Sequence, residues 1–178
     1  TMQAFQNHPL IDGICVVCLK GWEVVLQAYA NQFNITKFKW IFEGGDSNQH
    51  SIRNGLWGLR DAGCDENDII LVHDGVRPVV SERIISENIE KCQKYGYAIT
   101  GMICKEAIMQ KVDDCVKNID IPRERLVRTQ TPHTYLLHTL LKAHEEADSK
   151  GIDGTVASCT LMAELGIEDQ HLVMGSQK

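Results

Sequence analysis

The sequence predicts an α/β fold with a doubly wound, mostly parallel sheet. Apolar runs of strand length alternate with segments of helical period, and Ser and Gly residues stand at the borders of several helical segments. The composition agrees, because 43% hydrophobic and 24% charged residues are ordinary values for a soluble globular domain. With 178 residues the chain is long enough for a hydrophobic core of its own. We therefore expect a single domain over residues 1–178.

The first half of the chain reads as strand–helix units. Buried strands are expected at residues 11–19, 37–42 and 68–73. Helices are expected after them, at residues 22–33, from Ser51 to Gly63 and from Ser81 to Gly96. Ser is a preferred helix N-cap and Gly a preferred C-terminal stop, so Ser51 and Ser81 are expected to cap their helices.

The second half departs from this alternation. A strand is expected at residues 97–104, followed by a polar segment, 105–128, that contains Pro122. We interpret residues 105–128 as an extended arm or hairpin that projects from the sheet. Further on we expect a helix over residues 134–147, a helical stretch over 155–165 and a last strand over 170–174.

Charge and cysteine content restrict the function classes. The net charge of −6 argues against non-specific binding of nucleic acid or of an anionic membrane, although a local phosphate pocket stays possible. No apolar run is long enough to span a bilayer, and the first residues lack the features of a signal peptide. Seven cysteines, mostly within apolar patterns, suggest free thiols in a reducing cytoplasm. Cys15 and Cys18 have redox or metal spacing, but no second pair completes a site, so we favour a core role.

A first candidate site is the turn that contains Gly44, Gly45 and Asp46 and leads to Ser51. Glycines let a ligand approach the backbone closely, and a helix N-terminus favours anions. The alternative is a simple turn followed by a helix cap.

A second candidate is the heptad 72–78, Val-His-Asp-Gly-Val-Arg-Pro, directly after an apolar run. In α/β sheets, ligands bind outside the carboxyl ends of strands. Asp74 there can hold a hard cation and Arg77 can hold a phosphate. The alternative is a structural ion pair between Asp74 and Arg77. His73 alternates to the other face, so a hydrogen-bonded core histidine is favoured over a general base.

Residues 123–133 supply the remaining candidates. Arg123, Arg125 and Arg128 are expected on a solvated face of the arm, although one of them can still reach a phosphate. Thr131 belongs to the segment Gln-Thr-Pro-His that follows the arm.

Taken together, in order and spacing, these motifs resemble the 2-C-methyl-D-erythritol 4-phosphate cytidylyltransferase family and its relatives, the ribitol-5-phosphate cytidylyltransferases. The resemblance covers essentially the whole chain. It implies a Rossmann-like sheet of the nucleotidyltransferase type and a homodimer joined through the arm, residues 105–128. It also implies a Mg²⁺-dependent transfer of CMP from CTP to a polyol phosphate with release of pyrophosphate.

The resemblance also implies roles for individual residues. Asp74 would be the catalytic acid that holds Mg²⁺. The expected CTP-binding residues are Gly45, Asp46, Ser51 and Gly75. The expected acceptor-binding residues are Arg77, Arg123, Thr131 and Thr155, with Arg123 reaching the partner subunit's site.

The sequence departs from the family pattern in several places. The family's glycine-rich loop, with its main catalytic Arg and Lys, would lie upstream of Thr1, and an acceptor-binding Lys would lie beyond Lys178. We therefore expect the natural protein to continue at both ends. Asn48 stands where an Arg is common, Ala107 or Ile108 replaces a Thr, and Val156 follows Thr155 where an Asp is usual.

The acceptor therefore stays open at this level. It is expected to be 2-C-methyl-D-erythritol 4-phosphate, for isoprenoid precursor synthesis, with ribitol 5-phosphate or another polyol phosphate as the alternative. An alternative of another class is a non-catalytic, dimeric nucleotide-binding module.

Overall fold

The computed structural model describes residues 1–176, so Lys178 lies outside the described residues. Strands β1 (Ile14–Cys18) and β2 (Phe38–Glu43) form one parallel sheet. A larger sheet has the order β3-β7-β4-β8, with β3 at Ile69–Val72, β7 at Val127–Leu136, β4 at Tyr97–Ile103 and β8 at Leu172–Met174. The predicted α/β class is confirmed.

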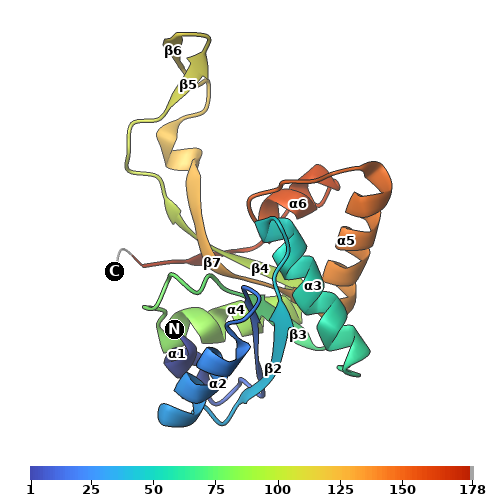
Figure 1. Ribbon diagram of the computed structural model, residues 1–178. Coiled ribbons are helices and arrows are strands. Elements are labelled where there is room, and N and C mark those ends of the chain that lie inside the picture. Colours follow the sequence, from blue (N-terminus) through green and yellow to red (C-terminus); the bar gives the residue numbers. More distant parts are fainter. Residues whose placement is uncertain (177–178) are drawn as a thin grey trace.

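Six α-helices flank these sheets among the described residues (Figure 1). Their bounds are α1 Met2–Gln6, α2 Glu23–Gln32, α3 Asn48–Asp61, α4 Glu82–Tyr95, α5 Leu137–Lys150 and α6 Ser158–Glu164. One buried cluster includes residues of α3, α5 and α6. A second includes residues of α2 and α4, and partly buried residues of α1 pack against it. Ile70 and Val72 of β3 pack against the first cluster, whereas Ile69 and Leu71 pack against the second. Because neighbouring strand residues point to opposite faces, helices cover both faces of the sheet, as the doubly wound prediction requires.

Strand β7 is the main difference from the predicted topology. It runs antiparallel between β3 and β4, while β1–β2 and β4–β8 are parallel pairs. The helix expected from residue 134 begins only at Leu137. Thr134 is held in the sheet instead, because it lies opposite Leu71 on one side and Ala98 on the other.

The helix caps are predicted correctly in one case and wrongly in another. The Ser81 side chain accepts a hydrogen bond from the Ile84 amide at 3.4 Å, and Gly96 ends the same helix with φ +88°. The predicted cap at Ser51 is wrong, because α3 begins at Asn48 and its N-cap is Ser47. Ser47 is in extended conformation and accepts from the His50 amide, three residues ahead, at 3.1 Å.

The seven cysteines are free thiols. Burial raises the pKa of Cys15 to about 12 and that of Cys92 to about 11. Both thiols are therefore protonated at neutral pH, which agrees with a packing role.

Residues 105–128 contain a hairpin of strands β5 (Met109–Val112) and β6 (Cys115–Asn118), followed by a 3-10 turn at Arg123–Arg125. In Figure 1 the β5–β6 hairpin stands well away from the two sheets, whereas Val127 and Arg128 already pair with β4. The arm's role in dimerisation stays a prediction. No helix in residues 1–176 is long and apolar enough to cross a bilayer.

Candidate functional site

Asp74 lies just beyond the carboxyl end of β3, and its amide is bonded to β7. The Asp74 N–H donates to Thr131 Oγ1 at 3.1 Å. The pairing of Val72 with His133 sets this contact, because it aligns the end of β3 with the Thr131 region of the long antiparallel strand. Two predicted site residues from distant parts of the sequence are therefore in direct contact.

Arg77 completes this group through a tight turn. Its amide donates to the Asp74 carbonyl at 3.0 Å, and its Nε donates to Asp74 Oδ2 at 2.9 Å. The two side chains are 47% and 37% exposed, so this ion pair is weak, on the order of 1 kcal/mol or less. A ligand with stronger charges can therefore rearrange it at low cost.

Two histidines beside this group are neutral at pH 7. Burial lowers the pKa of His133 to about 4 and lowers the pKa of His73 as well. His73 Nε2 lies 2.9 Å from the Arg77 carbonyl oxygen and its ring packs edge-on against Phe5, which agrees with the predicted core role. The positive charge beside Asp74 therefore comes from Arg77.

The turn between β2 and α3 forms a second group. The Gly45 amide donates to Ser51 Oγ at 3.1 Å, so Ser51 closes the turn from within the first part of the helix and not from its cap. A Cβ at Gly45 would lie 2.4 Å from His50 Cβ, so glycine is required there by the chain itself. Asp46 is exposed in this turn.

Gly75 differs from Gly45, because nothing in the described structure requires a glycine there. A Cβ at Gly75 would meet no atom within 4 Å, and its φ is not positive. Close approach of a ligand to the backbone would account for a glycine at this position.

Thr155 lies between α5 and α6 and is 8% exposed. Its N–H and its hydroxyl both donate to Gln49 Oε1, at 2.9 and 2.8 Å. Gln49 was not predicted as a site residue, because a Gln in the first turn of a helix gives no indication of a contact with a residue 106 positions away.

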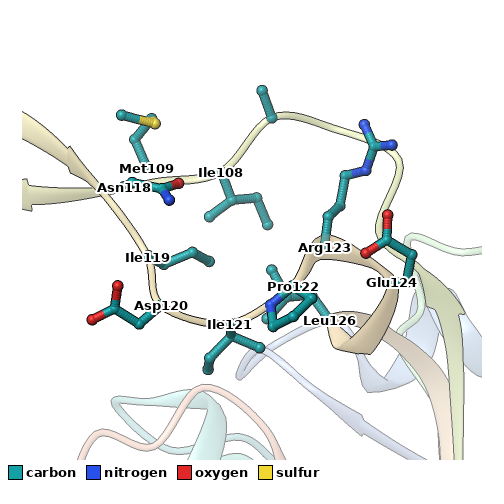
Figure 2. A pocket seen from close by; sticks show the side chains of 11 residues that line it. Ile108, Met109, Asn118, Ile119, Asp120, Ile121, Pro122, Arg123, Glu124 and Leu126 are labelled. Carbon is teal, nitrogen blue, oxygen red and sulfur yellow. The ribbon is translucent and has the colours of Figure 1, made fainter.

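Arg123 lies apart from the other candidate residues. It lines a cavity of about 600 Å³ at the base of the hairpin, whose walls are mainly apolar (Figure 2). Asp74, Arg77 and Thr131 are not in that lining. Within residues 1–176, no hydrogen bond joins Arg123, the Asp74 group, the Gly45 turn and Thr155 to one another.

The metal-ligating groups around Asp74 fit only a metal ion that takes most of its ligands from substrate phosphates and water. Within the described part of the chain, no three His, Cys, Asp or Glu residues converge on one point. Mg²⁺ is commonly bound by one or two carboxylates together with substrate phosphates and water, and a single Asp74 carboxylate satisfies that pattern.

Comparisons with known proteins agree on one family, in which the relatives are named for two different acceptors. The family model described as 2-C-methyl-D-erythritol 4-phosphate cytidylyltransferase (IspD) matches residues 1–178. A ribitol-5-phosphate cytidylyltransferase of Lacticaseibacillus paracasei is 40% identical, with 100% of this chain and 76% of the relative covered. A protein of the same name from Vibrio parahaemolyticus is 35% identical, with coverages of 98% and 73%. A 2-C-methyl-D-erythritol 4-phosphate cytidylyltransferase of Clostridium acetobutylicum is 34% identical, with coverages of 99% and 74%.

Solved structures extend the agreement to three dimensions. The structure of 4-diphosphocytidyl-2C-methyl-D-erythritol synthase from Anaerococcus prevotii superposes with a TM-score of 0.85 and covers 99% of this chain and 75% of that chain. The sequences are 20% identical in this comparison, so it establishes a shared fold.

Proposed function

The chain belongs to the 2-C-methyl-D-erythritol 4-phosphate cytidylyltransferase family and is a CTP-dependent nucleotidyltransferase, and on this premise we propose that its acceptor is ribitol 5-phosphate. The observation that carries the proposal is the 40% identity to the ribitol-5-phosphate cytidylyltransferase of L. paracasei, compared with 34% to the methylerythritol-phosphate enzyme of C. acetobutylicum. The products would be CDP-ribitol and pyrophosphate.

The nucleotide side of the proposed site is formed by Gly45, Asp46, Ser51 and Gly75. The Ser51 hydroxyl fixes the Gly45 backbone, which leaves the turn preorganised for a nucleotide. The lack of a Cβ at Gly75 leaves room for a phosphate next to the backbone.

The acceptor side is proposed to consist of Arg77, Thr131, Thr155 and, from a partner subunit, Arg123. Support for the partner's contribution comes from the position of Arg123 in the 3-10 turn at the base of the projecting hairpin, where it lines a cavity that does not include Asp74. A homodimer with interlocking arms would bring the partner's Arg123 to the acceptor phosphate.

In the proposed reaction an oxygen of the acceptor phosphate attacks the α-phosphorus of CTP, and the bond to the bridging oxygen of pyrophosphate breaks. Little proton transfer is needed, so positioning and charge stabilisation supply most of the catalysis. Asp74 would hold Mg²⁺, which supplies positive charge where negative charge develops on the phosphates. Thr131 holds the Asp74 backbone, and Arg77 would exchange its contact with Asp74 for an acceptor oxygen.

The second candidate acceptor is 2-C-methyl-D-erythritol 4-phosphate. It is favoured by the description of the family model, which matches the whole chain. The two candidates differ only in the polyol, so the CTP side of the site is common to both.

The test is pyrophosphate release by the full-length protein with CTP, Mg²⁺ and each acceptor separately. We expect turnover with ribitol 5-phosphate at a kcat/KM well above that with 2-C-methyl-D-erythritol 4-phosphate. A higher kcat/KM with 2-C-methyl-D-erythritol 4-phosphate would identify that compound as the acceptor instead. Absence of pyrophosphate with both acceptors would overturn the proposed function.

A further inference from the structure

The first turn of α3 lies beside the segment between α5 and α6 (Figure 1). Three consecutive residues of this turn contact the segment through their side chains. Asn48 Nδ2 donates to the Val156 carbonyl at 3.0 Å, and His50 Nε2 lies 3.2 Å from an Asp153 carboxylate oxygen. Gln49, between them, bonds to residues 152 and 155. Because α3 follows directly on the Gly45 turn, this segment is attached to the nucleotide side of the proposed site.

The side chain of Gln49 has a single orientation that satisfies its neighbours. Its Nε2 donates to the Ile152 carbonyl at 2.9 Å, while its Oε1 accepts from the Thr155 N–H at 2.9 Å. A carbonyl only accepts and an N–H only donates, so exchanging the amide nitrogen and oxygen would break both bonds. Gln49 is 3% exposed, so water cannot readily replace these partners.

This orientation also determines what the Thr155 hydroxyl can do. The hydroxyl lies 2.8 Å from Gln49 Oε1, an atom that can only accept, so its single proton points at Gln49. The oxygen of Thr155 is left with lone pairs alone. It can accept a hydrogen bond from an O–H group, but it has no proton to give to a phosphate oxygen.

We propose that Gln49 is a positioning residue of the acceptor site. It orients Thr155 so that the Thr155 hydroxyl oxygen accepts a hydrogen bond from one hydroxyl of the polyol and does not bind the phosphate. The proposal rests on the proposed function, in which Thr155 contacts the acceptor. A phosphate monoester at neutral pH offers mainly acceptor oxygens, whereas each polyol carbon carries an O–H donor. Specificity for the polyol hydroxyl thus comes from the buried Gln49 amide, because its oxygen accepts the only proton of the Thr155 hydroxyl.

The test combines variants with acceptor analogues that each lack one hydroxyl of ribitol 5-phosphate. For the wild-type full-length protein we expect one analogue to lose about tenfold in kcat/KM, the value of one neutral hydrogen bond. The Thr155→Val variant should use that analogue and the complete acceptor within about twofold of each other, and Thr155→Ser should restore the preference. Gln49→Met should raise the KM for the acceptor about tenfold while the KM for CTP changes less than about twofold.

Asp148→Ala is the matched control. It removes the 2.8 Å bond between Arg53 Nη1 and Asp148, which also links α3 to α5, but it leaves Gln49 and Thr155 in contact. Its acceptor KM should equal that of the wild type. The two Thr155 variants keep the test decisive if Gln49→Met does not fold.

The outcomes separate this inference from the proposed function. A wild-type protein that releases no pyrophosphate from CTP with any polyol phosphate overturns both. A wild-type protein that turns over, while Thr155→Val retains the wild-type preference against every deoxy analogue, overturns the role of Gln49 and Thr155 and leaves the proposed function standing.

Discussion

Acidification is predicted to destabilise the fold through two buried histidines. His133 and His144 are each 2% exposed, and burial lowers the pKa of each from 6.5 to about 4. Between these two values the unfolded chain binds more protons than the folded chain, so the free energy of unfolding falls as the pH falls. The stabilisation is complete above about pH 6.5 and is lost progressively toward pH 4.

The size of the effect follows from the two pKa values. From pH 7 to pH 5, each histidine should reduce the free energy of unfolding by about 2 kcal/mol. The histidines lie on different elements, β7 and α5, so their effects should add to about 4 kcal/mol. That is a large fraction of the total stability of an ordinary domain, about 5–15 kcal/mol.

The assay is urea unfolding at pH 7 and pH 5 of the wild type and of His144→Phe. Neither ring nitrogen of His144 has a hydrogen-bond partner in residues 1–176, so a phenyl ring leaves no described group unpaired. Between the two pH values the variant should lose about 2 kcal/mol less than the wild type. Leu141→Met, a buried apolar neighbour on α5, is the control, and any effect on its stability should be equal at both pH values. Equal losses in the wild type and in His144→Phe would refute the reasoning.

Three further predictions concern the site. Asp74→Asn should lower kcat by about a hundredfold and abolish its response to Mg²⁺, measured as pyrophosphate release over a Mg²⁺ titration; an unchanged Mg²⁺ response would exclude Asp74 as a ligand. Gly75→Ala should keep the wild-type melting temperature, because its Cβ meets no atom within 4 Å, yet weaken CTP binding in calorimetry; unchanged CTP affinity would show that no ligand approaches there. Arg123→Ala should raise the KM for the acceptor about tenfold more than that for CTP in steady-state kinetics, and equal changes would indicate a structural role.

The elements that the sequence predicted well are those whose signals are local. The α4 helix has its cap at Ser81 and its stop at Gly96 because a Ser side chain and a glycine with positive φ act within one turn. The prediction of a cap at Ser51 was wrong, because the helix begins four residues earlier and the side chain of Ser47 accepts the hydrogen bond from the His50 amide. Which of two nearby serines caps a helix depends on backbone geometry that the residue types do not contain.

Non-local features could not be predicted in the same way. The antiparallel course of β7 and its extension to Leu136 depend on pairing with β3 and β4 at the same time. That Asp74 and Thr131 belong to one site was expected only through the family resemblance. Their direct contact was not predicted, and it follows from the strand register. The hydrogen bond that Thr155 donates to Gln49 is not indicated by any of the sequence motifs.

The measurement that tests the central claim most directly is a competition between the two acceptors. The full-length protein is mixed with CTP, Mg²⁺ and equal concentrations of ribitol 5-phosphate and 2-C-methyl-D-erythritol 4-phosphate, and the cytidine diphosphate products are quantified by mass spectrometry. We predict that CDP-ribitol is the main product and that the cytidine diphosphate products together equal the pyrophosphate released. A predominance of the methylerythritol product, or CTP left intact, would contradict the account.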